Sequence, residues 1–174
     1  VNEAMIGERE AHGTPFRRAG EDGCLINDRV VQIGLRGTGY APGDFAWARD
    51  QGWSVVTAEE IHGKPLHRLM DQVRAHVGDA PCYLSFDIDS LAPGLATGTG
   101  TQEIGGLSDW QALQIVRGMA GLNLVGCDLV EVSPPFDTTG TTALTAANLV
   151  YEMLCVLPGA PRNLPEPLHS FTID

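Results

Sequence analysis

The sequence predicts an α/β protein built around a parallel sheet, and two observations lead to that fold class. Short apolar runs of strand length alternate along the chain with segments that have the 3.6-residue periodicity of helices. The chain has 174 residues, of which 43% are hydrophobic and 19% are charged, and this is enough for one globular domain with a real core. Such alternation is typical of repeated βα units, whose strands run in the same direction.

Two strands and two helices are predicted in the first half of the chain. Residues 30–36 (VVQIGLR) and 54–58 (SVVTA) are the strands. Between them, residues 42–52 (PGDFAWARDQG) are expected to form a short helix that Gly52 ends. Residues 66–77 follow as an amphipathic helix. Its apolar stripe consists of Leu66, Leu69, Met70, Val73 and Val77.

Two further strands enclose a helix in the second half. Residues 82–88 are apolar on both faces, as is typical of a buried parallel strand, and residues 124–132 form the next strand. The helix between them begins at Ser108, because Gln111 follows at the spacing of a capping box, and it continues to Gly118.

The last predicted helix covers residues 141–156 and is apolar enough to be buried on most of its surface. We expect one domain over residues 1–161 and an irregular, proline-rich tail over residues 162–174. The chain begins at Val1 without Met, signal peptide or helix start. We therefore expect an N-terminally truncated segment of a longer protein.

The charge balance restricts the partners of this protein. There are 22 acidic and 11 basic side chains, and the formal net charge of -11 repels phosphate backbones. This argues against nucleic acid as a partner and favours a cationic ligand or a metal. No apolar run approaches the roughly 18 residues that a membrane-spanning helix needs, so no membrane partner is expected.

The cysteines predict a reducing compartment. They are widely spaced, without a C-x-x-C pair, and we expect reduced core residues and neither a disulfide frame nor a zinc site. These residues are Cys24, Cys82, Cys127 and Cys155. A cytoplasmic location follows, with the mitochondrion as the alternative, since any targeting segment would precede Val1.

Two carboxylates end the predicted strand at residues 82–88. Asp87 and Asp89 are separated only by Ile88, so they point to the same side of the chain where the strand ends. Burying two like charges together is costly unless a cation lies between them. The pair therefore predicts a site of hard oxygen ligands for Mn²⁺ or Mg²⁺. The alternative is that the pair caps a neighbouring turn or helix.

Other features favour a site at this edge of the sheet. The next strand also carries acids, Asp128 and Glu131, and the ligands of open parallel sheets bind beyond the carboxyl ends of strands. Residues 91–108 (LAPGLATGTGTQEIGGLS) form a long loop that would wall the site. Phosphoryl transfer with an aspartate nucleophile is a competing chemistry, but it needs a downstream lysine, and the only lysine, Lys64, lies upstream.

These residues resemble the ureohydrolases, the family of arginases and agmatinases. The segments that carry the resemblance are IGEREAHGTPFRRAGEDG, RVVQIGLRGTGY, SFDIDSLAPGLATGTGTQEIGGLS and GCDLVEVSPPFDTTGTTALTAANLVYEMLCVLPG. The resemblance covers residues 1–161, and the upstream segments are similar to agmatinases and guanidinobutyrases especially. It implies a three-layer α/β/α sandwich, and hydrolysis of a guanidinium to urea and an amine by water activated between two Mn²⁺ ions.

The resemblance also assigns roles to residues. Asp87 and Asp89 match the last two of six metal ligands, and Glu131 matches the carboxylate that holds the guanidinium. His12 matches the histidine that passes a proton to the leaving amine, although a histidine before Gly-Thr-Pro is otherwise more often an ordinary loop residue. Asn2 falls where arginases contact the far end of the substrate.

Some positions depart from the family. Its other four metal ligands should precede Val1, and no histidine of this chain replaces them by spacing. Ala92 stands where the family usually has Asp, and Thr97 and Gln102 where it usually has Pro, so a looser site wall is expected. Asp128 is expected to be structural or to support the ligands from outside. The pair Arg17 and Arg18 is expected to be solvated, with a subunit neighbour or a substrate carboxylate as the alternatives.

The resemblance leads to a functional expectation for the longer protein. It should be a manganese-dependent hydrolase of a small guanidino compound, with agmatine as the first candidate and a role in polyamine biosynthesis. The alternatives are guanidinobutyrase or guanidinopropionase specificity, and a non-catalytic ureohydrolase-like subunit or regulator. A homo-oligomer, a trimer or a hexamer, is expected, and the 174-residue chain alone should be inactive.

Overall fold

The structure is a computed structural model and describes residues 1–39, 41 and 43–160. Its strands pair in parallel as predicted: β1 (Val31–Leu35) with β2 (Ser54–Thr57), and β3 (Cys82–Asp87) with β4 (Leu124–Val130). Within the described residues these strands form two separate sheets, because no hydrogen-bonded ladder joins β1 to β3. The predicted parallel order is confirmed, but the four strands alone do not make one continuous sheet.

All four predicted helices are present, and two short ones were not predicted. The helices are α1 (Pro15–Glu21), α2 (Ala46–Asp50), α3 (Ala58–Ile61), α4 (His67–Val77), α5 (Asp109–Gly118) and α6 (Thr141–Val156). The predicted capping box of α5 forms, with Ser108 accepting from the backbone N–H of Gln111. The unpredicted α3 has the same signal in its sequence, because Thr57 and Glu60 also form a capping box.

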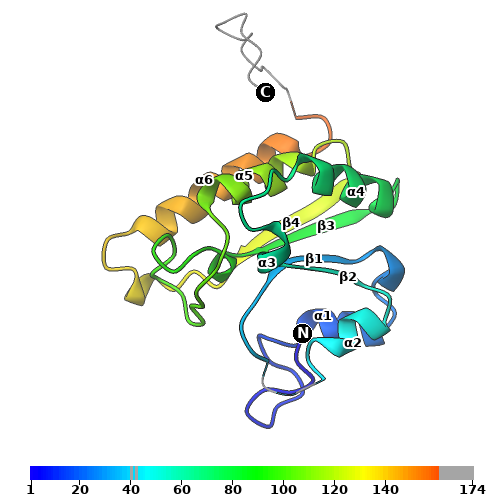
Figure 1. The fold of residues 1–174 in the computed structure, drawn as a ribbon, viewed down its shortest axis with the longest axis horizontal. Coiled ribbons are helices and arrows are strands. Elements are labelled where there is room, and N and C mark those ends of the chain that lie inside the picture. Colours follow the sequence, from blue (N-terminus) through cyan, green and yellow to red (C-terminus); the bar gives the residue numbers. More distant parts are fainter. Residues whose placement is uncertain (40, 42, 161–174) are drawn as a thin grey trace, which may run out of the picture.

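Helices lie on both sides of the strands (Figure 1). α5 packs against α4 and α6, and α6 contacts β4, so these three helices cover one side of the β3–β4 sheet. α1 and α2 lie on the opposite side of the molecule, next to β1 and β2. This arrangement agrees with helix, sheet and helix layers.

The main hydrophobic core lies between the β3–β4 sheet and the helices α4, α5 and α6. In α4 the predicted stripe faces this core: Leu66, Met70, Val73 and Val77 are buried, and Leu69 is partly buried. The helices approach closely at Gly118, where a Cβ atom would overlap the Met70 side chain. The core thus fixes the strands whose carboxyl ends carry the acidic residues.

Two expectations about burial are wrong. In β3, Leu84 and Phe86 are buried in the core and Cys82 is partly buried against it, while Tyr83 is 54% exposed. Within the described residues, helices cover only one face of this sheet. α6 is also buried on one face only, since Leu144 and Tyr151 are 65% and 66% exposed. Apolar composition predicted burial, but the neighbouring elements decide which face is covered.

The cysteine prediction holds in part. All four cysteines are free in the described part of the chain, as expected. Cys82 and Cys127 are half-buried. Cys24 and Cys155 are exposed, so they are not core residues within the part of the chain that the structure describes. Among the described helices, none is both long and apolar enough to cross a membrane.

Candidate active site

The candidate site begins where β3 ends. Asp87 is the last residue of this strand, and the 3-10 turn Ile88–Ser90 follows directly and carries Asp89. Ile88 is fully buried, so the core holds the turn between the two acids in place. One oxygen of Asp87 accepts a hydrogen bond of 3.1 Å from the backbone N–H of Asp89. The capping alternative is therefore correct for one carboxylate oxygen.

The two carboxyl groups influence each other strongly. Asp87 keeps contact with solvent, but the surrounding protein removes much of its hydration. This burial, the charge of Asp89 and a side-chain hydrogen bond with Asp89 raise the pKa of Asp87 to about 7. A raised pKa of this kind means that the described residues supply too little positive charge to stabilise both carboxylates in their ionised form.

The residues present fit part of a metal site. Of the ion pairs formed by described residues, none involves Asp87 or Asp89, so no basic side chain neutralises them there. Paired carboxylates that need a cation are suitable ligands for a hard divalent ion. The structure groups no three metal-ligating side chains within residues 1–39, 41 and 43–160, so a complete site needs further ligands.

Glu131 reaches the same area from β4, which it directly follows. Its backbone has φ of 68°, the left-handed region that side chains with a Cβ rarely adopt, and such strain is often found at functional sites. Its Oε1 atom lies 3.5 Å from Nδ1 of His12. Its charge also contributes to the raised pKa of Asp87. The structure thus brings His12, Glu131 and the acidic pair together.

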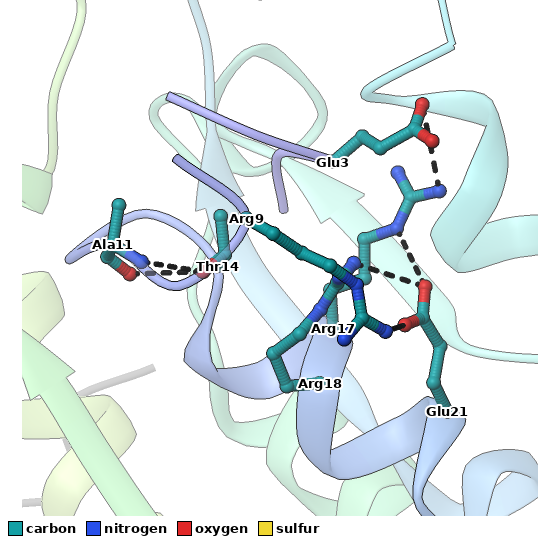
Figure 2. A network of polar contacts seen from close by, with 7 residues as sticks. All are labelled: Glu3, Arg9, Ala11, Thr14, Arg17, Arg18 and Glu21. Carbon is teal, nitrogen blue, oxygen red and sulfur yellow. Dashed lines mark hydrogen bonds and ion pairs between the residues drawn. The ribbon is translucent and has the colours of Figure 1, made fainter. Parts of the chain in front are cut away.

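The loop that carries His12 is held by local hydrogen bonds. The hydroxyl of Thr14, which is buried, accepts from the backbone N–H of Ala11 and donates to its carbonyl, both at 3.0 Å (Figure 2). Asn2 lies beside this loop, since its backbone N–H donates to the carbonyl of Gly13 at 3.1 Å. A Cβ atom on Gly13 would lie 2.8 Å from the Asn2 side-chain nitrogen, so glycine allows this close approach.

Threonines of the long loop contact the acidic segments. The hydroxyl of Thr99 donates to the carbonyl of Glu131 at 2.8 Å, and the hydroxyl of Thr101 donates to the carboxylate of Asp89. Neither residue was singled out from the sequence, although the density of threonine in this loop was the available signal. The loop is therefore a wall of the site, as its position predicted.

The departures in this loop are partly compensated. The side-chain N–H of Gln102 donates to the carbonyl of Thr97 at 2.6 Å, so the two positions without proline are joined to each other. At the base of the loop, Leu91 and Leu107 form a parallel bridge. The expected loosening of the wall is opposed by these contacts.

Arg36 was not recognised as part of this region. It follows β1 and donates hydrogen bonds to the backbone carbonyls of Asp89, Leu91 and Glu103. The sequence held no local signal for this role, because the partners lie more than 50 residues further along the chain.

The prediction that Arg17 and Arg18 are solvated is wrong. Each side chain is only 12% exposed, and Glu21 accepts hydrogen bonds from both and from Arg9 (Figure 2). Arg17 also lies over the ring of Trp47, 4.9 Å from its centroid. The helical spacing of these residues in α1 brings the arginines back onto Glu21. Both guanidinium groups therefore form ion pairs within the chain.

Fold and site together define an α/β protein with paired acids at the carboxyl ends of parallel strands. The chain matches the Arginase family over residues 1–155 and belongs to that family. The predicted resemblance and the arginase-like α/β fold are thereby confirmed.

Similar proteins show the same relationship. The guanidinobutyrase of Pseudomonas aeruginosa is 62% identical over 93% of this chain and 51% of its own length. The mitochondrial agmatinase of Gallus gallus is 57% identical over 91% of this chain and 47% of its own length. The solved structure of proclavaminate amidino hydrolase from Streptomyces clavuligerus has a TM-score of 0.82 at 39% identity, and the match covers 87% of this chain and 50% of that one. The chain thus spans about half the length of these relatives.

Proposed function

We propose that the full-length protein containing this chain hydrolyses a guanidino compound to urea and an amine, with manganese as its cofactor. The observation that supports this most is the meeting of Asp87, Asp89, Glu131 and His12 at the ends of β3 and β4. These residues were assigned from the sequence by their match to the ureohydrolases, and they come from three separate segments of the chain.

Each residue has a distinct task in this proposal. Asp87 and Asp89 contribute two carboxylates to a binuclear Mn²⁺ site, and manganese when bound supplies the activation of water at neutral pH. Glu131 holds the planar guanidinium, which complements a two-oxygen acceptor. His12 delivers a proton to the departing amine, a task suited to imidazole. Asn2 contacts the far end of the substrate.

The substrate is the finer part of the proposal. Agmatine suits the overall acidity of the chain, but net charge reflects the whole surface and not the site. The relative with 62% identity is named a guanidinobutyrase, and a human relative with 55% identity is named a guanidino acid hydrolase. We therefore place guanidinobutyrate first and agmatine second.

A urea-release assay tests the activity and the substrate together. The full-length protein with Mn²⁺ should release urea from guanidinobutyrate faster than from agmatine, guanidinopropionate or arginine. Faster release from agmatine would restore it as the substrate and would support a role in polyamine biosynthesis. A folded, manganese-loaded protein that released no urea from any of the four would refute the hydrolase proposal.

That last result would favour a second candidate, a non-catalytic ureohydrolase-like subunit or regulator. The observation in its favour is that the described residues group fewer than three metal-ligating side chains. We also propose a homo-oligomer, a trimer or a hexamer, in the cytoplasm, with the mitochondrion as the alternative. Light scattering of the full-length protein and imaging of a tagged copy check these two points.

A further inference from the structure

Arg36 connects the end of β1 to the segment that follows β3. It lies directly after β1, and its Nη2 atom donates to the carbonyls of Asp89 at 2.6 Å, Leu91 at 3.2 Å and Glu103 at 2.8 Å. Its Nε atom donates to the carbonyl of Glu103 at 3.0 Å. Within the part of the chain that the structure describes, β1 and β3 share no ladder. The guanidinium therefore links the end of β1 to the turn that follows β3.

The three carbonyls lie at structurally important points of the candidate site. Asp89 is one of the two acids, and Leu91 begins the long loop and forms the bridge to Leu107 that closes it. Glu103 lies in the second half of that loop, shortly after Thr101, whose hydroxyl contacts the Asp89 carboxylate. Arg36 thus holds the backbone on both sides of the contact between the loop and the acid.

Arginine suits this position for a chemical reason. Its planar guanidinium presents five N–H donors in a fixed geometry, so one side chain can satisfy several carbonyls at once. Among the ion pairs of the described residues, none involves Arg36, so its donors serve the backbone and not a carboxylate. A lysine would keep the charge, but it would lose the second donor atom, Nε, and the planar group that holds Nη2 toward the three carbonyls.

We propose that Arg36 is a positioning residue that sets the geometry of Asp89 and of the loop 91–107 for metal binding. The inference rests on the proposed function for its catalytic consequence, but its structural part stands independently. Residues that orient metal ligands without touching the metal typically contribute about 10–100-fold to metal affinity or activity. A change at Arg36 should therefore weaken manganese binding although Arg36 itself is not a ligand.

The test compares three variants of the full-length protein: Arg36→Gln, Arg36→Lys and Arg29→Gln. Arg29 is a matched control, because it also donates to a backbone carbonyl, that of Val77 at 3.0 Å. Val77 ends α4 before β3 begins, whereas the acidic pair lies where β3 ends. Hydrogen exchange of the amides in residues 89–107 is measured without metal. Manganese affinity is measured by calorimetry, at a temperature where each variant is fully folded.

We expect Arg36→Gln to accelerate exchange in residues 89–107 and to weaken manganese binding by about 10–100-fold. Arg36→Lys should restore part of both, and Arg29→Gln should change neither. At saturating manganese, Arg36→Gln should lower kcat more than it raises KM, because the hydrogen bonds of Arg36 go to backbone carbonyls of the site. Wild-type exchange and affinity in Arg36→Gln would overturn the inference. Equal weakening by Arg29→Gln would also overturn it, since the effect would then be general destabilisation.

The two proposals fail in different ways. If the wild-type protein released no urea, the proposed function would fail, while the exchange of residues 89–107 would still test the role of Arg36. If urea release was normal and Arg36→Gln behaved as wild type, the positioning role would fail and the function would stand. If Arg36→Gln did not fold, the Arg36→Lys variant would be the test. Manganese affinity and amide exchange equal to those of wild type in Arg36→Lys would then count against the inference.

Discussion

The acidic pair shows how a single turn combines two tasks. One oxygen of Asp87 accepts from the backbone N–H of Asp89 and stabilises the turn, and one oxygen of Asp89 accepts from the hydroxyl of Thr101. The second oxygen of each carboxylate faces the proposed metal site. In the described residues the two like charges lie together without a basic partner. Burial and the charge of Asp89 raise the pKa of Asp87 to about 7, so ionising both carboxyl groups is unfavourable. A structural role alone would have favoured an uncharged side chain at one of these positions.

A substitution at Asp89 tests the metal role at this scale. Asp89→Asn keeps the size of the side chain but removes its charge, so manganese binding and urea release by the full-length protein should both fall. A ligand should matter more than its supporting residues, and we expect a loss of at least about 100-fold in urea release.

Asp79→Asn serves as the control for this substitution, because Asp79 is exposed and its side chain forms no hydrogen bond or ion pair with the described residues. It removes the same charge and should leave urea release unchanged. An Asp89→Asn protein with normal turnover would show that Asp89 is not a metal ligand.

At the scale of elements, α6 begins next to the site and is fixed there by Asp137. The carboxylate of this residue accepts hydrogen bonds from the backbone N–H groups of Ala143 at 2.8 Å and Thr142 at 3.2 Å. The buried hydroxyl of Thr142 accepts in turn from the N–H of Gly98, which belongs to the site loop. The first turn of α6 thus supports the wall that Thr99 and Thr101 form.

This arrangement predicts a pH-dependent contribution to stability. The hydrogen bond from Ala143 chiefly, and that from Thr142, hold the pKa of Asp137 below its ordinary value, although burial acts in the opposite direction. A carboxyl group whose pKa is lower in the folded state stabilises the fold above its unfolded pKa of about 4, and this stabilisation is lost as the pH falls through the folded pKa.

Asp137→Ala should therefore lower the urea concentration at which half of the protein is unfolded at pH 7. The difference in this concentration between the variant and wild type should narrow below about pH 4. Equilibrium urea denaturation at a series of pH values measures both quantities. A difference that stayed constant down to pH 2 would mean that the ionised carboxylate does not contribute.

At the scale of the whole molecule, the described chain leaves apolar surface uncovered. Tyr83 and Val125 on the β3–β4 sheet are 54% and 65% exposed, and Leu144, Tyr151 and Leu154 on α6 are all more than half exposed. Large exposed apolar side chains that gather on one face are commonly covered by other protein. The chain spans about half the length of the relatives that it matches.

We expect the 174-residue chain, produced alone, to self-associate in solution. Tyr151→Lys should reduce this association, because it places a charge on the exposed face of α6. Gln72→Lys adds the same charge to the exposed surface of α4 and should have less effect. Multi-angle light scattering measures the outcome. A monodisperse monomer of the unmodified chain would contradict the expectation.

The parts of this protein that could be predicted from sequence depend on local interactions. Apolar periodicity located β1 to β4, α4 and α6, and the spacing of Ser108 and Gln111 located the start of α5. Asp87 and Asp89 were recognised because a strand ends between them. Helix periodicity, caps and strand alternation involve residues only a few positions apart, so they can be recognised directly in the sequence.

Other features were decided only by the tertiary structure. The approach of His12 to Glu131, the attachment of Arg36 to the loop around Asp89, and the pairing of Arg17 with Glu21 instead of solvent depend on how distant segments pack. The same holds for the open faces of β3 and α6, whose composition predicted burial. Contacts between distant segments are set by strand pairing and loop closure, and neither can be derived from the local pattern of residues along the chain.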